Sequence, residues 1–262
     1  MRICCNKYKE LRKKFKPNLK SILGWEIINV YGDINLNQEY TFKNNNLIIK
    51  CEDTYLHLII KLILGFKILN EIFNIKEGIL RCGDDLIFNM DNLKIFLNIK
   101  NKNDYIGKNF DKRDIINPIE TINLDLIKND LFMINYYKKN IDEQIYINKT
   151  LNKYGLKIDN INVVPYIYNY IALGHIYYLS NKSIKLIINH FIEKDNNHNF
   201  TVIYENNKFY PYAYEDLGIG YILFKNNIDL TYYSEMWFNP HYQNFDTGDL
   251  KYICNHTNEG NN

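Results

Sequence analysis

Two adjacent carboxylates that follow a short apolar run are the first candidates for chemistry in this sequence. The run spans residues 78–82 and ends at Gly83, Asp84 and Asp85. Hard cations such as Mn²⁺ or Mg²⁺ prefer oxygen ligands and need few protein carboxylates when phosphates supply the remainder. An acidic pair that stands alone is more often a solvated turn. The pair therefore predicts either a divalent-cation site or a polar turn.

A second acidic pair, Glu215 and Asp216, precedes a run of small and apolar residues that is typical of a helix. A carboxylate at the start of a helix can serve as a general base. It can also be an N-terminal cap that interacts favourably with the helix dipole. Taken alone, the pair favours the cap.

Two other positions give weaker signals. Gly174, followed by Tyr177 and Ser180, is compatible with a close approach of the backbone to a ligand and equally with a strand-to-helix corner. His241 lies among aromatic residues, where a lone histidine is more often structural than a ligand. No histidine spacing of the metal-binding type accompanies either position.

The segments that must position these residues alternate between strand and helix patterns. Residues 35–46 are polar and are expected to form a loop. Asn89 and Ser180 are good helix caps, each at the start of a segment with an apolar helical face. In chain order, the patterns predict a strand over 25–31, a strand over 47–49, a buried helix over 55–69, a strand over 78–82 and a helix over 90–97. This alternation indicates an α/β fold, in which ligands bind at the carboxyl ends of the strands.

Charge and cysteine content exclude several classes of protein. The 32 basic and 30 acidic side chains give a net charge of +2, so there is no excess charge to drive nucleic-acid binding. The five cysteines never occur as C-x-x-C, which argues against a disulfide framework and a zinc site. No segment is long and apolar enough to span a membrane. We therefore expect a soluble protein without a nucleic-acid partner or a membrane span.

Four blocks of the chain gain specificity from their order. Residues 53–67 resemble the stretch D-S-Y-x-x-L-x-x-K-x-x-x-G-x-K, and residues 81–89 resemble K-T-D-D-D-V-F-V-N. Residues 165–180 resemble P-Y…G-x-G-Y-V-L-S, and residues 215–220 resemble E-D-V-x-x-G. These motifs are those of the β-1,3-galactosyltransferase and fringe family of glycosyltransferases. The resemblance covers roughly residues 50–220.

The resemblance implies a GT-A-type, Rossmann-like nucleotide-sugar-binding fold with a central, mostly parallel but mixed sheet flanked by helices. It implies an inverting transfer of a hexose from a UDP-sugar donor to a hydroxyl of a glycan, glycoprotein or other glycoconjugate acceptor, with a β-1,3 linkage expected. It also implies Mn²⁺ or Mg²⁺ as the cofactor.

Site residues follow from the positions that match the family motifs. Asp216 matches the base that deprotonates the acceptor hydroxyl. The expected metal ligands are Asp85, Asp84 and His241. The positions expected to contact the donor are Arg81, Gly83, Asp84, Gly174 and Glu215.

Two positions depart from the family pattern. Gly83 replaces the first acid of the D-D-D triplet, and Ile176 replaces the second glycine of the G-x-G motif. An alternative interpretation is therefore a catalytically impaired carbohydrate- or nucleotide-sugar-binding module with the same fold. Retention of Asp85 and Asp216 favours the enzyme.

The expected organisation is a single glycosyltransferase domain over residues 1–245, followed by a polar tail over 246–262. Its donor-binding half is expected at about 20–100 and its acceptor and catalytic half at about 101–245. The family's membrane anchor and an apolar signal-peptide region are both missing, which favours the cytoplasm over the secretory-pathway lumen. Four N-x-S/T sequons are present, as chance predicts for an Asn-rich chain, at Asn148, Asn181, Asn199 and Asn255.

Overall fold

The computed structural model describes residues 1–4, 21–51, 53, 58–109, 171–194, 200–202, 215–238 and 251–256. Within these residues, eight strands form one sheet with the order β13-β9-β10-β7-β1-β4-β6-β5. In chain order they are β1 (Arg2–Ile3), β4 (Asn29–Gly32), β5 (Tyr40–Lys43), β6 (Asn46–Ile49), β7 (Gly78–Cys82), β9 (Tyr105–Gly107), β10 (Ile176–Ser180) and β13 (Thr231–Tyr232).

The sheet is mixed, with parallel pairing at its centre. β1 pairs in parallel with β4 and β7, β4 with β6, and β9 with β13. β10 is antiparallel to both β7 and β9, and β5 is antiparallel to β6. The carboxyl ends of the parallel strands therefore lie at the same end of the sheet as the amino end of β10. The predicted α/β class with a mixed sheet is confirmed.

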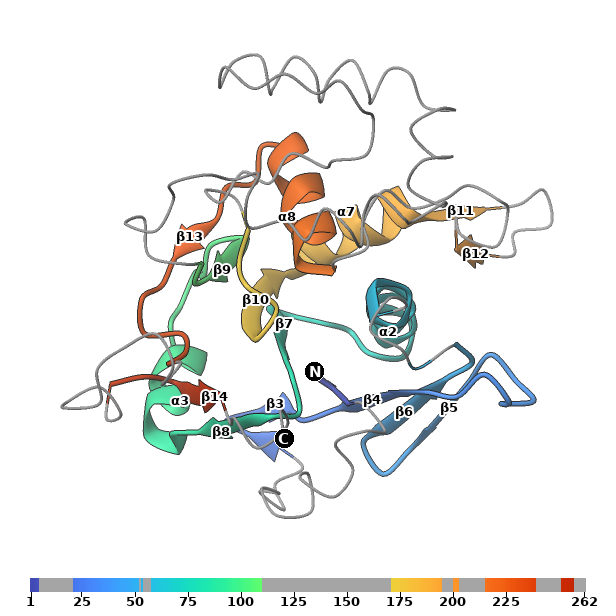
Figure 1. The fold of residues 1–262 in the computed structure, drawn as a ribbon, viewed down its shortest axis with the longest axis horizontal. Coiled ribbons are helices and arrows are strands. Elements are labelled where there is room, and N and C mark those ends of the chain that lie inside the picture. The colour runs from blue at the N-terminus through green and yellow to red at the C-terminus, as the bar shows by residue number, and fades with distance from the viewer. Residues whose placement is uncertain are drawn as a thin grey trace, which may run out of the picture.

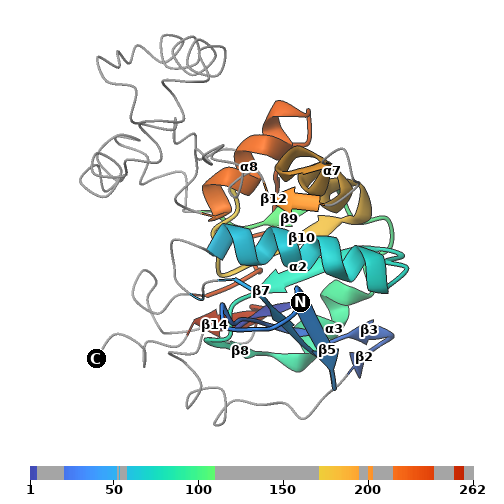
Figure 2. The same cartoon turned by 90° about the vertical axis from the view of Figure 1, so that its right-hand side faces the viewer.

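Helices cover both faces of this sheet (Figures 1 and 2). The described helices are α2 (Leu58–Ile72), α3 (Met90–Leu97), α7 (Asn181–Phe191) and α8 (Glu215–Lys225). α2, α7 and α8 contact one another on one face, and α3 packs on the other. Three short strand pairs complete the described structure: β2 (Ser21–Ile22) with β3 (Trp25–Glu26), β8 (Leu86–Phe88) with β14 (Cys254–His256), and β11 (Ile192–Lys194) with β12 (Phe200–Val202).

Alternation along the central strands divides the core into two clusters, one on each face of the sheet. On β7, Ile79 packs on the face covered by α2, α7 and α8, whereas Leu80 packs on the α3 face. On β10, Tyr177 and Tyr178 divide in the same way. By this alternation Arg81 faces the same side as Ile79, which is the side of α8.

Local capping signals predicted two helix starts correctly. The side chain of Asn89 accepts hydrogen bonds from the backbone N–H groups of Asp91 and Asn92 at the start of α3. The Ser180 Oγ accepts a hydrogen bond of 3.2 Å from the Ser183 N–H at the start of α7. Each cap satisfies N–H groups that have no partner inside the helix.

Two predictions in the first fifty residues were wrong because tight turns were missed. The predicted loop over 35–46 contains β5, which pairs with β6 through a two-residue turn at Asn44 and Asn45. Their φ angles of 50° and 60° are those of a hairpin turn that asparagine tolerates. The predicted strand over 25–31 is two strands in different sheets: β3 pairs with β2 through a turn at Leu23 and Gly24, whereas β4 belongs to the eight-stranded sheet.

Strands from both predicted halves of the domain join in one sheet, since β7 pairs with β10. Part of the segment expected to be a polar tail is folded against the core, which differs from the prediction. β14 pairs with β8, and Tyr252, Ile253 and Cys254 are buried. These apolar side chains lower the free energy of the folded state by leaving water, so this part of the segment is held in the core.

Candidate active site

The first acidic pair lies at the carboxyl end of β7, as predicted. β7 ends at Cys82, and the Gly83 N–H donates a hydrogen bond of 2.9 Å to the His175 carbonyl. Asp84 is only 8% exposed, and Asp85 is half-buried. The acidic turn is therefore attached to the residue that precedes β10.

Gly83 leaves a space that the carboxylate of Asp85 uses. A Cβ atom added at Gly83 would lie 2.5 Å from Asp85 Oδ1, far inside van der Waals contact. Any side chain at this position would therefore displace the Asp85 carboxylate. The presence of Gly83 in place of the first acid of the family triplet therefore affects the conformation of Asp85, which the resemblance assigns to the metal.

The second acidic pair forms the first turn of α8. The Gly174 N–H donates a hydrogen bond of 3.1 Å to Asp216 Oδ2. A Cβ atom at Gly174 would lie 3.0 Å from Glu215 Oε2, so the glycine permits a close approach of the turn to both acids. Acids in the first turn also complement the helix dipole, so the cap interpretation is compatible with this geometry.

The two acidic segments meet at one short turn, Gly174–His175. Asp216 binds the backbone of Gly174, and the acidic turn after β7 binds the backbone of His175. Through this turn the structure connects two acidic segments, Gly83–Asp85 and Glu215–Asp216, that are more than a hundred positions apart in the sequence. The structure thus brings Gly83–Asp85 and Asp216 to the same end of the sheet.

Glu215 lies beneath this turn and is 5% exposed. Its Oε1 atom is 3.0 Å from Arg81 Nε and accepts a hydrogen bond of 2.7 Å from the Tyr177 hydroxyl. The Arg81 guanidinium carbon also lies 5.3 Å from the centroid of the Tyr177 ring. Both Arg81 and Glu215 are therefore engaged inside the protein, and their predicted contacts to a donor stay predictions.

Burial dominates the ionisation of this cluster. It raises the pKa of the Glu215 carboxyl to about 7, against the lowering effect of Arg81. Burial alone lowers the pKa of Arg81, but the combined attraction of Glu215, Tyr177, Cys82 and Asp216 outweighs it, so the net pKa is raised. Burial, followed by the charge of Glu215, raises the pKa of Tyr177 well above its ordinary value. Tyr177 therefore donates its hydrogen bond as a neutral phenol.

Aromatic residues lie on the other side of the turn. The His175 ring is 4.6 Å from the Trp237 ring, measured between centroids. The ammonium group of Lys108 lies 4.9 Å from the Trp237 ring and 5.1 Å from the Tyr252 ring, and it donates to the Trp237 carbonyl. Sequence reasoning missed Lys108 and Trp237. The available signal was Trp237 itself, one of two tryptophans in the chain.

A buried lysine lies at the same end of the sheet, beyond β1 and β6. Lys61 is 2% exposed, and its Nζ atom binds Asp53 Oδ1 at 2.6 Å and the Cys4 carbonyl at 2.8 Å. Asp53 and Lys61 belong to the first block of the resemblance, and the structure places them in contact. The pair connects α2 to the residue that follows β1.

The donor chemistry of the acidic turn fits a hard divalent cation. Mg²⁺ and Mn²⁺ are commonly held by one or two carboxylates together with the phosphates of a substrate, and Asp84 and Asp85 provide such oxygens. In the described part of the chain, no three His, Cys, Asp or Glu side chains form a group that can hold a metal ion. His241, the third predicted ligand, lies outside the described residues.

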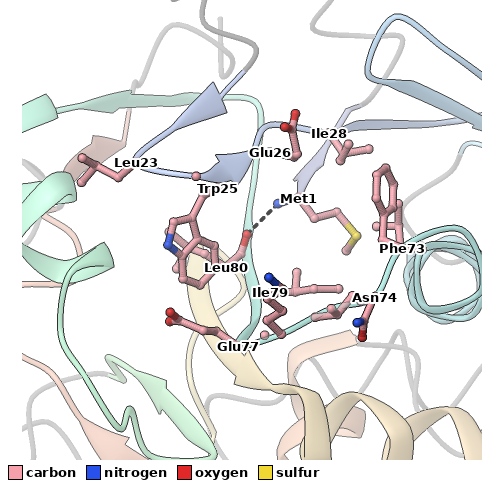
Figure 3. Close-up of a pocket in the computed structure, with 15 residues that line it drawn as sticks. Met1, Leu23, Trp25, Glu26, Ile28, Phe73, Asn74, Glu77, Ile79 and Leu80 are labelled. Atoms are coloured by element: carbon pink, nitrogen blue, oxygen red, sulfur yellow. Dashed lines mark hydrogen bonds between the residues drawn. The ribbon is translucent and has the colours of Figure 1, made fainter.

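A cavity of about 370 Å³ lies at the opposite end of β7 (Figure 3). It is lined mainly by apolar side chains, among them Leu23, Trp25 and Phe73. Its wall includes the start of β7, Gly78–Leu80. Because the acids follow the other end of this strand, the cavity is separate from the candidate site.

No protein-family model matches this chain, and no curated protein matches it either. Among the helices described, none has the length and apolar character needed to cross a membrane.

Proposed function

We propose that this chain is an inverting glycosyltransferase with a GT-A-type fold, which transfers a hexose from a UDP-sugar to a hydroxyl of a glycan or glycoconjugate. One observation carries the proposal: Gly83–Asp85 and Asp216 are both bound to the Gly174–His175 turn, at the carboxyl end of the parallel strands. Open α/β sheets bind ligands at that end. The order of the four sequence blocks supports the same assignment.

The reaction requires charge compensation at one side of the donor sugar and a base at the other. Asp216 accepts the proton of the acceptor hydroxyl while that oxygen forms a bond to the anomeric carbon. The bond from this carbon to the diphosphate breaks, and the nucleoside diphosphate departs with the electron pair. A Mn²⁺ or Mg²⁺ ion held by Asp84 and Asp85 would supply Lewis-acid stabilisation of the departing phosphates. Attack from the face opposite the leaving group inverts the anomeric configuration.

The test is release of UDP from a panel of UDP-sugars in the presence of Mn²⁺ and candidate acceptors. We expect Asp216→Asn to lower kcat by about 10²-fold or more while UDP affinity is retained, because general base catalysis is typically worth that much. Asp229→Asn, at an exposed acid after α8, is the matched control. Equal activity of Asp216→Asn and the wild type would exclude the assigned base.

A binding module with the same fold is the second candidate, and Gly83 is the observation that favours it. The glycine removes one of the three acids of the family triplet, and with it the contact to the donor's ribose or to a metal-bound water that the resemblance assigns to that acid. Binding of UDP-sugars without turnover, across the donor and acceptor panel, would support the module. Turnover with any pair of substrates would exclude it.

A further inference from the structure

The buried cluster beneath the Gly174–His175 turn has a geometry that explains how the candidate base is held. Arg81 and Tyr177 are directly opposite each other on β7 and β10, and both side chains face α8. Glu215, the first residue of α8, meets both of them. The helix that carries Asp216 is therefore attached to the two central strands through its preceding residue.

Arg81 also reaches the turn itself. Its Nη1 atom lies 3.5 Å from the His175 carbonyl, and the same carbonyl accepts the hydrogen bond from the Gly83 N–H. Arg81 thus contacts the residue that anchors the acidic turn and the residue that begins α8. It is 3% exposed, so solvent does not compete strongly for these contacts.

We propose that Arg81 and Glu215 are positioning residues. Their buried ion pair, together with the hydrogen bond that Tyr177 donates to Glu215, holds the Gly174–His175 turn so that Asp216 and the acidic turn face one substrate. This assignment rests on the proposed function. In it, Arg81 and Glu215 act by holding other groups in place and do not contact the donor. It predicts that the hydrogen bond from the Gly174 N–H to Asp216 depends on the Arg81–Glu215 ion pair beneath the turn.

Ionisable groups on three elements interact electrostatically with Asp216. They are Glu215, which precedes it on α8, Arg81 on β7 and the buried hydroxyl of Tyr105 on β9. Among these groups, Arg81 is the permanent cation. Loss of the pair is therefore expected to change the environment of the Asp216 carboxylate.

The experiment uses the double variant Arg81→Met with Glu215→Gln. This variant leaves neither charge buried without its partner, so the fold is expected to survive, and Gln keeps an acceptor for the Tyr177 hydroxyl. The chain has 12 glycines, so selective ¹⁵N-glycine labelling gives a simple amide spectrum. Loss of one signal in Gly174→Ala assigns Gly174.

We expect the Gly174 amide proton in the double variant, above pH 7, to move at least halfway toward its position in Asp216→Ala. The matched control is a second buried pair, removed as Lys61→Met with Asp53→Asn. It changes the core near α2 and is expected to leave the Gly174 signal in place. A Gly174 signal unchanged in the Arg81 and Glu215 variant, or moved equally by the control, would overturn the positioning role.

Kinetics then separate this role from the proposed function. We expect kcat of the double variant to fall by about 10-fold to 10²-fold, toward that of Asp216→Asn, with UDP affinity unchanged. A shifted Gly174 signal in a chain that turns over no donor would support the positioning contact and refute the glycosyltransferase. Normal kcat in the double variant of an active enzyme would refute the positioning role alone.

Discussion

Glu215 makes the folding stability of this protein depend on pH around neutrality. Its carboxyl has a pKa of about 7 in the folded chain, against an ordinary value of 4.5, because burial disfavours the charged form. A raised folded pKa means that the folded state binds the proton more tightly than the unfolded state. The stabilisation is therefore complete below about pH 4.5 and is lost as pH rises through about 7.

The size of the effect follows from the difference between the two pKa values. A shift of roughly 2.5 units at 1.36 kcal/mol per unit corresponds to about 3 kcal/mol of unfolding free energy. Glu215→Gln cannot ionise and resembles the protonated acid in shape. We expect it to remove this dependence, so that its stability relative to the wild type increases by up to about 3 kcal/mol between pH 5 and pH 8.

Urea unfolding followed by circular dichroism at pH 5, 6, 7 and 8 measures this difference. Because other titrating groups are common to both proteins, the comparison of variant with wild type isolates residue 215. Glu39→Gln, at an exposed acid, is the control and is expected to follow the wild-type curve. A difference between Glu215→Gln and the wild type that stays constant with pH, or that changes in the opposite sense, would refute the reasoning.

Three further variants test the same region. Arg81→Met removes the charge that lowers the pKa of Glu215, so we expect Glu215 to ionise, and the unfolding free energy to fall, at higher pH than in the wild type. Urea unfolding at pH 7 and pH 9 measures this change. Gly83→Ala places a Cβ 2.5 Å from an oxygen of Asp85, so we expect the Mn²⁺-dependent affinity for UDP, measured by calorimetry, to fall about 10-fold. Gly65→Ala is the control, because its added Cβ makes only ordinary contacts, and it should match the wild type. Gly174→Ala places a Cβ 3.0 Å from Glu215, and we expect kcat to fall more than UDP affinity; equal losses would contradict that expectation.

Much of the local structure could be predicted from the sequence. The caps at Asn89 and Ser180 and the apolar strand over 78–82 depend on neighbouring residues only, and all three are present. The hairpin at Asn44 and Asn45 was missed, because asparagine is so frequent in this chain that two more gave no signal.

Short-range patterns were enough to predict that acids follow β7 and begin α8, because hydrophobic periodicity and capping act over a few residues. The shared binding of these acids to the Gly174–His175 turn, and the contact of Glu215 with Arg81, followed only from the folded structure. The pairing of β7 with β10 joins segments separated by about ninety residues, and its geometry depends on how the two faces of the sheet pack. Such contacts arise from burial and packing across the whole core, which no local pattern in the chain encodes.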